Sequence, residues 1–115
     1  MKVYGHSKLA VVLFTRLLAE HLKGTGVTVN CVNPGMSATN LSRDAGWFSA
    51  KFFKLIAKDA AKGAETPIYL ASSSEVETIT GEYFEKKVVK TTNKETYDMD
   101  AAKKLWDVSK KYVGL

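Results

Sequence analysis

The fold of this chain is decided by one stretch, Val27-Thr28-Val29-Asn30-Cys31-Val32-Asn33-Pro34-Gly35. Its first six residues are mainly β-branched and apolar, which predicts a strand over residues 27–32 that is buried on both faces, as in parallel sheets. The Asn-Pro-Gly triplet that follows ends the strand in a tight turn. The stretch therefore predicts a buried parallel strand that leads directly into a turn.

The segments on either side of this strand predict further elements. Residues 3–22 have the apolar spacing of a helix, and glycines at positions 24 and 26 stop it. Residues 59–72 predict a second helix, in which Pro67 should cause a kink because proline lacks a backbone donor. A helix between two strands implies a right-handed crossover, so strands at 27–32 and 80–89 should be parallel neighbours. After a polar loop at 90–97, Asp98 should cap a last helix that ends near Tyr112.

Tyr4 and Lys8 carry the chemistry at the start of the chain. On a helix, residues four apart share one face and lie one turn apart. An ammonium beside a phenol favours the phenolate, and a tyrosine tuned in this way can exchange a proton with an alcohol or a carbonyl. Taken alone, the pair could equally be an ordinary contact between a tyrosine and a lysine on the surface of a helix. A second match, Tyr83 with Lys87, lies in the predicted strand, where the two groups are about 13 Å apart and cannot touch.

Two motifs in this order make the signal specific. The stretch Tyr4-Gly5-His6-Ser7-Lys8 resembles the Tyr-x-x-Ser-Lys catalytic helix of the short-chain dehydrogenase/reductase family. The stretch Pro34-Gly35-Met36-Ser37-Ala38-Thr39 resembles the Pro-Gly-x-x-x-Thr cofactor turn that follows the next strand of that family. Residues 81–84 and 102–106 are similar to its retinol-dehydrogenase-like branch. The resemblance runs from about residue 3 to the end of the chain.

The resemblance implies an α/β fold, namely the C-terminal half of a Rossmann-like doubly wound parallel sheet in the order helix–strand–helix–strand–helix. Residues 1–115 would form one partial NAD(P)-binding domain, with a substrate loop at about 40–58. The glycine-rich pyrophosphate turn, the catalytic serine and the structural asparagine of the family have no counterpart here. A truncated protein, or a start codon placed too late, is the simplest expectation.

The resemblance also implies hydride transfer between NAD(P)(H) and an alcohol or carbonyl. Tyr4 would be the general acid or base, and Lys8 would assist it and bind the ribose hydroxyls of the nucleotide. Pro34 and Gly35 would let the backbone approach a flat ligand. The Ser37 amide would contact the nicotinamide carboxamide, and the Thr39 hydroxyl would lie near the carboxamide or the pyrophosphate. The branch favours NADP over NAD, and an apolar substrate such as a retinoid or a lipid aldehyde.

Residues 40–58 support three interpretations. Their aromatic and aliphatic residues repeat at helical spacing, with lysines opposite them, from Trp47 to Lys58. This pattern fits a helix packed on the core, a lid over a hydrophobic substrate as in the resembled family, or a helix on an anionic membrane surface. The wide apolar stripe of residues 9–22 is a further interaction surface, since the corresponding helix of the family often packs against a partner subunit, so a homo-oligomer is an open expectation.

The composition argues against several other classes of function. Hydrophobic residues make up 45% and charged residues 25%, as in ordinary globular chains. The net charge of +5 comes from scattered lysines with only two arginines, a pattern that does not fit nucleic-acid binding. Cys31 is the single cysteine, so an internal disulfide is impossible, and one cysteine with two histidines does not make a metal site.

The same composition sets expectations for location and independence. No apolar run approaches the ~20 residues of a membrane span, so we expect a cytoplasmic location, with membrane association through residues 47–58 left open. Two strands do not easily make a stable sheet. We therefore expect the isolated chain to be inactive, and unstable or self-associated. The alternative is a non-catalytic remnant that acts as an interaction module through its first helix.

Overall fold

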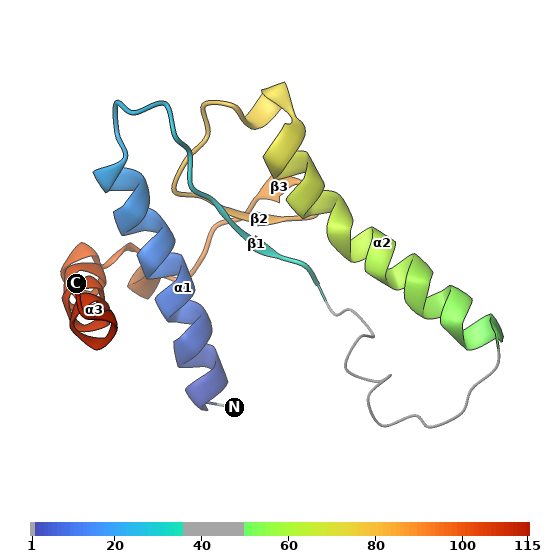
Figure 1. Ribbon diagram of the computed structural model, residues 1–115, viewed down its shortest axis with the longest axis horizontal. Helices are drawn as coiled ribbons and strands as arrows, with labels where there is room; N and C mark the ends of the chain where they lie inside the picture. Colours follow the sequence, from blue (N-terminus) through green and yellow to red (C-terminus); the bar gives the residue numbers. More distant parts are fainter. Residues whose placement is uncertain (1, 36–49) are drawn as a thin grey trace.

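The structure is a computed structural model that describes residues 2–35 and 50–115, with side chains described for residues 3–35 and 60–115. Its main elements are α1 (Lys2–His21), β1 (Cys31–Asn33), α2 (Ala50–Ser72), β2 (Tyr83–Glu85), β3 (Val88–Val89) and α3 (Met99–Val113). Two short 3₁₀ helices, η2 (Ser74–Val76) and η3 (Lys94–Tyr97), lie between them. Figure 1 shows α1 and α3 together on one side of the strands and α2 on the other. The predicted α/β class, consistent with part of a Rossmann-like fold, is confirmed.

The central sheet has the strand order β1-β2-β3. Strands β1 and β2 are parallel, with Cys31 opposite Tyr83, which confirms the predicted parallel neighbours. The first strand begins later than predicted, at residue 31 and not at residue 27. The reason lies in the Asn30 side chain, which donates to the Ile79 carbonyl at 2.7 Å and accepts from the Glu82 amide at 3.1 Å. A side chain thus replaces part of the regular ladder before β1.

The prediction of one strand over residues 80–89 is wrong, because the segment folds into a hairpin. Lys86 and Lys87 have φ values of 50° and 62°, so both turn residues are left-handed, as in the two-residue turns that join antiparallel strands. Strand β3 then pairs back on β2 in an antiparallel sense. The sheet is therefore mixed. Lys87 lies in the turn and not in a strand, which corrects the context assumed for its match with Tyr83.

The helices follow the sequence closely. α1 has the predicted extent, and Asp98 caps α3 as predicted, since its side chain accepts a hydrogen bond from the Ala101 amide at 3.0 Å. α2 is longer than the predicted helix over 59–72 and continues past Pro67 to Ser72. The three interpretations of residues 40–58 depend on side chains that lie outside the described residues. Of this stretch the structure describes only the backbone of residues 50–58, which is helical.

The core lies mainly between α1 and α3. Leu13, Leu17 and Ala102 are buried together, and the Phe14 ring stacks on Trp106 with a centroid distance of 5.3 Å. In the sheet, Phe84 is 1% exposed. Part of the wide apolar stripe of α1 is left uncovered, because Val11 is 51% exposed. This packing holds α1 firmly along most of its length and leaves its first two turns open to solvent.

Candidate functional site

Tyr4 and Lys8 lie in the exposed first turns of α1. The Lys8 Nζ is 5.2 Å from the centroid of the Tyr4 ring, so the two side chains share one face of the helix, as their spacing predicts. Tyr4 is 66% exposed, and Lys8 is exposed as well. The phenol and the ammonium are therefore close to each other and accessible to a ligand.

The Asn-Pro-Gly turn lies at the carboxyl end of β1. The Asn33 Oδ1 accepts a hydrogen bond from the Gly35 amide at 3.0 Å, which is the way asparagine commonly closes a turn. Gly35 has a φ of 79°, a conformation that disfavours residues with a Cβ. Apart from its chain neighbours, no heavy atom of the described residues lies within 4 Å of the position where a Cβ would stand on Gly35, so none of these residues blocks close approach to its backbone. Ser37 and Thr39, the other predicted cofactor residues, lie outside the described residues.

The Tyr4–Lys8 pair and the Asn33-Pro34-Gly35 turn lie at the same end of the part of the chain that the structure describes. In Figure 1 the N-terminal end of α1 and the carboxyl end of β1 both point to the lower side of the view. The helix α1 also contacts the strand β1. Open α/β sheets bind their ligands outside the carboxyl ends of their strands. The structure thus brings Tyr4 and Lys8 together, and it places Pro34 and Gly35 at the same end but in a separate hollow.

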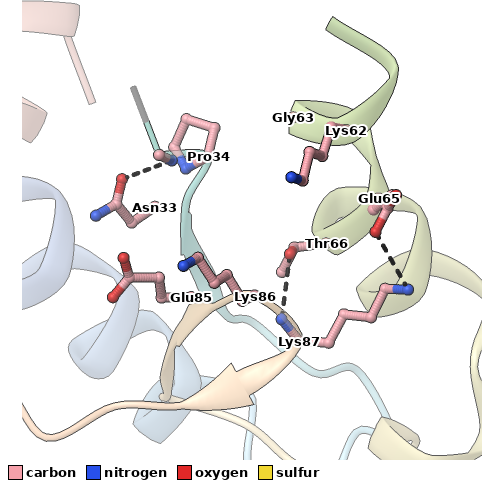
Figure 2. A pocket seen from close by; sticks show the side chains of 10 residues that line it. Asn33, Pro34, Lys62, Gly63, Glu65, Thr66, Glu85, Lys86 and Lys87 are labelled. Atoms are coloured by element: carbon pink, nitrogen blue, oxygen red, sulfur yellow. Dashed lines mark hydrogen bonds and ion pairs between the residues drawn. The ribbon is translucent and has the colours of Figure 1, made fainter. Parts of the chain in front are cut away.

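The hollow beside Pro34, here called the proline-turn hollow, has a volume of about 280 Å³. Figure 2 shows Pro34 and Lys62 on opposite sides of it, with an ion pair between Lys87 and Glu65 at 3.6 Å. The Lys87 amide donates to the Thr66 hydroxyl at 3.2 Å, which fixes the β2–β3 turn against α2. The strand predicted over residues 80–89 gives no indication of this wall, because it places residues 86 and 87 in a strand.

A second hollow, here called the Lys8 hollow, has a volume of about 570 Å³. α1 contributes Lys8, Leu9 and Val12 to it, and the segment 91–96 forms the opposite wall. The sequence predicts only a polar loop for residues 90–97. The signal that could have indicated more is its density of threonines, since hydroxyl groups at three positions in six residues can bond to a neighbouring side chain.

Cys31 is a free, half-buried thiol. Burial raises its pKa, and a hydrogen bond with Thr15 and the charge of Arg16 lower it by less. A raised pKa keeps the thiol protonated at neutral pH, which makes a nucleophilic role at this position unfavourable.

In residues 2–35 and 50–115, no three or more His, Cys, Asp or Glu side chains are grouped so as to hold a metal ion. Over the same described ranges, every helix is either too short or too polar to traverse a lipid bilayer.

Comparison with known proteins identifies what this chain is similar to. A family model described as short chain dehydrogenase matches residues 1–47, the span that contains both motifs. Retinol dehydrogenase 14 of Homo sapiens is 44% identical over 118 residues, which cover 97% of this chain and 35% of that protein. Retinol dehydrogenase 13 of Mus musculus is 39% identical over 120 residues, which cover 97% of this chain and 36% of that protein.

A third relative gives the same result. Dehydrogenase/reductase SDR family member 13 of Bos taurus is 37% identical over 120 residues, which cover 100% of this chain and 32% of that protein. This chain spans about one third of the length of these relatives. No solved structure matches it. The resemblance that the two motifs predict is confirmed.

Proposed function

We propose that this chain, which resembles the short-chain dehydrogenase/reductase family and its retinol-dehydrogenase-like branch, supplies the proton-transfer residues of an NAD(P)-dependent oxidoreductase. The observation that carries the proposal is the exposed pair of Tyr4 and Lys8, in which the Lys8 Nζ lies 5.2 Å from the centroid of the Tyr4 ring. The pair lies at the end of the fold where the Asn-Pro-Gly turn also lies. The names of the relatives support an apolar alcohol or carbonyl as substrate, such as a retinoid or a lipid aldehyde. NADP is favoured over NAD.

The chemistry assigned to this chain is the movement of one proton. During reduction the Tyr4 hydroxyl donates its proton to the carbonyl oxygen, and during oxidation the Tyr4 phenolate takes the proton of the alcohol. The Lys8 ammonium stabilises the phenolate that forms in the first case. The nicotinamide nucleotide, when bound, supplies or accepts the hydride.

The described residues fit one end of such a nucleotide. Lys8 is an exposed donor that would hold the ribose hydroxyls, and Gly35 offers open backbone against which the nicotinamide ring would lie. Ser37 and Thr39 are proposed to contact the carboxamide through an amide and a hydroxyl. These are roles for this chain's own groups, and each can be removed by a single substitution.

A chimera tests the proposal directly. The matching third of mouse retinol dehydrogenase 13 is replaced by this chain, and the oxidation of NADPH is followed with an apolar aldehyde. We expect Tyr4→Phe to lower kcat by about 10²–10⁴-fold, because only the hydroxyl is lost. Tyr112→Phe, which alters a residue that is 85% exposed on α3, is the matched control and should leave kcat unchanged. A folded chimera that works equally well with Tyr4→Phe would refute the role of Tyr4.

We propose that the 115 residues by themselves do not turn over substrate. The sheet consists of strands of three, three and two residues, which is marginal for independent stability. Val11, Val27 and Ile68 are 51%, 55% and 62% exposed, so apolar surface is left open. Saturable binding of NADPH together with turnover by the isolated chain would contradict this.

The exposed apolar face of α1 favours a second function, that of an interaction module. Val11 and Phe14 are 51% and 42% exposed on a helix that is otherwise well packed. Such a module would pair with a second copy or with a longer relative. Specific one-to-one association of this chain with mouse retinol dehydrogenase 13, without redox activity of this chain itself, would support the interaction module over catalysis.

A further inference from the structure

One ridge of α1 links the proposed proton-transfer pair to a buried arginine. Tyr4, Lys8, Val12 and Arg16 follow each other at intervals of four residues, so they form one ridge that winds slowly around the helix. Val12 is 7% exposed and lines the Lys8 hollow. Arg16 is 8% exposed and lies about 12 Å further along the same rigid helix than Lys8. Whatever Arg16 holds therefore has a fixed position relative to Lys8.

Arg16 holds the segment 91–96. Its guanidinium donates to the Thr96 carbonyl at 2.6 Å, to the Thr96 hydroxyl, and to the Thr92 hydroxyl at 3.0 Å. The guanidinium carbon lies 3.6 Å from the centroid of the Tyr97 ring. Within the described residues no carboxylate forms an ion pair with Arg16. A buried cation is costly without partners, so these contacts with one short segment are what stabilise the charge.

The segment is organised around the same hydroxyl groups. The Thr92 and Thr96 hydroxyls are 2.6 Å apart, and the Thr96 hydroxyl donates to the Asn93 carbonyl at 2.6 Å. The Thr96 amide also donates to the Asn93 carbonyl, at 3.0 Å. The segment lies beyond the last strand, so it has no ladder to hold it. The side-chain hydrogen bonds that join it to α1 come from Arg16, while α3 packs against α1 just after it.

The Lys8 hollow lies between this segment and α1. Leu9 and Val12 make one side apolar, while the opposite wall carries the threonine hydroxyls, Asn93 and Glu95. Lys8 lines the hollow as well, and its Nζ lies 5.2 Å from the centroid of the neighbouring Tyr4 ring. Its volume of about 570 Å³ falls in the range typical of small-molecule sites. Such a lining suits an elongated apolar molecule with a single hydroxyl or carbonyl group at one end.

We infer that the segment 91–96 forms a substrate wall beside Lys8, and that Arg16 is the positioning residue that holds this wall. The inference rests on the proposed function, because Lys8 marks the reacting end only if Tyr4 and Lys8 serve proton transfer. It assigns substrate selection to a segment that lies against α1, on the side of the strands opposite α2. Thr91 is exposed at the rim of the hollow and makes no side-chain hydrogen bond within the described residues.

The test uses the 115-residue chain, with retinol as a fluorescent probe and amide hydrogen exchange as the structural readout. In the wild-type chain we expect saturable one-to-one binding and protected amides at Thr96 and Asp98. Arg16→Met should abolish this protection and weaken retinol binding at least about tenfold, since even one lost methylene contact in a hydrophobic pocket is worth about tenfold or more. Arg16→Lys should restore part of both effects, and Lys103→Met, at an exposed position on α3, should change neither.

A second variant separates the wall from general stability. Thr91→Trp fills the rim of the hollow without removing any hydrogen bond of Arg16, so it should weaken retinol binding while amide exchange stays as in the wild type. The inference is overturned if the wild-type chain does not bind retinol, if it shows no protection at residues 96 and 98, or if either Arg16→Met or Thr91→Trp leaves the affinity unchanged. Because this binding needs no nucleotide, retinol binding by the 115-residue chain together with an inactive chimera would count against the proposed function alone.

Discussion

Burial decides the chemistry of the single cysteine. It raises the pKa of the Cys31 thiol, so the folded chain holds this proton to a higher pH than the unfolded chain does. The resulting contribution to stability is fully present below the ordinary thiol pKa of about 8.5 and is lost as the pH rises through the higher folded pKa. We expect the alkylation rate of Cys31 by iodoacetamide to rise at higher pH in the native chain than in urea. Identical pH profiles would contradict the effect of burial.

Gly35 is the residue on which the proline turn depends. Its φ of 79° is unfavourable for any residue with a Cβ, by about 1–2 kcal/mol. We expect Gly35→Val to destabilise the turn by this amount and to weaken NADPH binding by the chimera. Gly5→Ala, on helix α1 with no positive φ, is a matched control that should not destabilise the chain. Equal NADPH affinity in the chimeras with Gly35→Val and without it would argue against the nicotinamide role of the turn.

At the scale of elements, the β2–β3 hairpin carries strain that one substitution should relieve. The backbone of Lys86 adopts the left-handed conformation, which glycine, asparagine and aspartate tolerate better than lysine does. We expect Lys86→Gly to stabilise the folded chain by about 1 kcal/mol, as measured by urea unfolding. Lys90→Gly, at a nearby position with no positive φ, should destabilise it or have no effect. A stabilising Lys90→Gly, or a destabilising Lys86→Gly, would show that the turn is not strained.

The last helix depends on its cap. The Asp98 side chain accepts the Ala101 amide at 3.0 Å, and the helix it begins covers Leu13 and Leu17 of α1 through Ala102. We expect Asp98→Ala to lower the free energy of unfolding by about 1 kcal/mol. Asp107→Ala, which removes only an exposed ion pair with Lys110, should cost less than about 0.5 kcal/mol. Equal effects of the two substitutions would contradict the capping role.

At the scale of the whole molecule, apolar surface remains uncovered. Val11 on α1 is 51% exposed and Val108 on α3 is 52% exposed. If the apolar face of α1 is the surface that associates, Val11→Lys should shift the chain toward the monomer in sedimentation velocity, while Val108→Lys should not. Equal sedimentation of all three proteins would place the contact elsewhere.

The local elements and the chemical motif were predictable because they depend on neighbours in the sequence. The extent of α1, the Asp98 cap and the shared face of Tyr4 and Lys8 follow from helical spacing alone. The parallel pairing of β1 and β2 followed from the order of helix and strand. Each of these depends on rules that act over one turn or over one connection.

Only the tertiary structure decided the rest, because it depends on contacts between residues far apart. The hairpin at Lys86 and Lys87 is held by Thr66, which is twenty-one residues away from Lys87. Both turn residues are lysines, which are not among the residue types that predict a turn. The wall at 91–96 is held by Arg16, eighty residues before Thr96. A polar loop and a charged helix residue have no sequence pattern that joins them, so their meeting beside Lys8 appears only when the chain is folded.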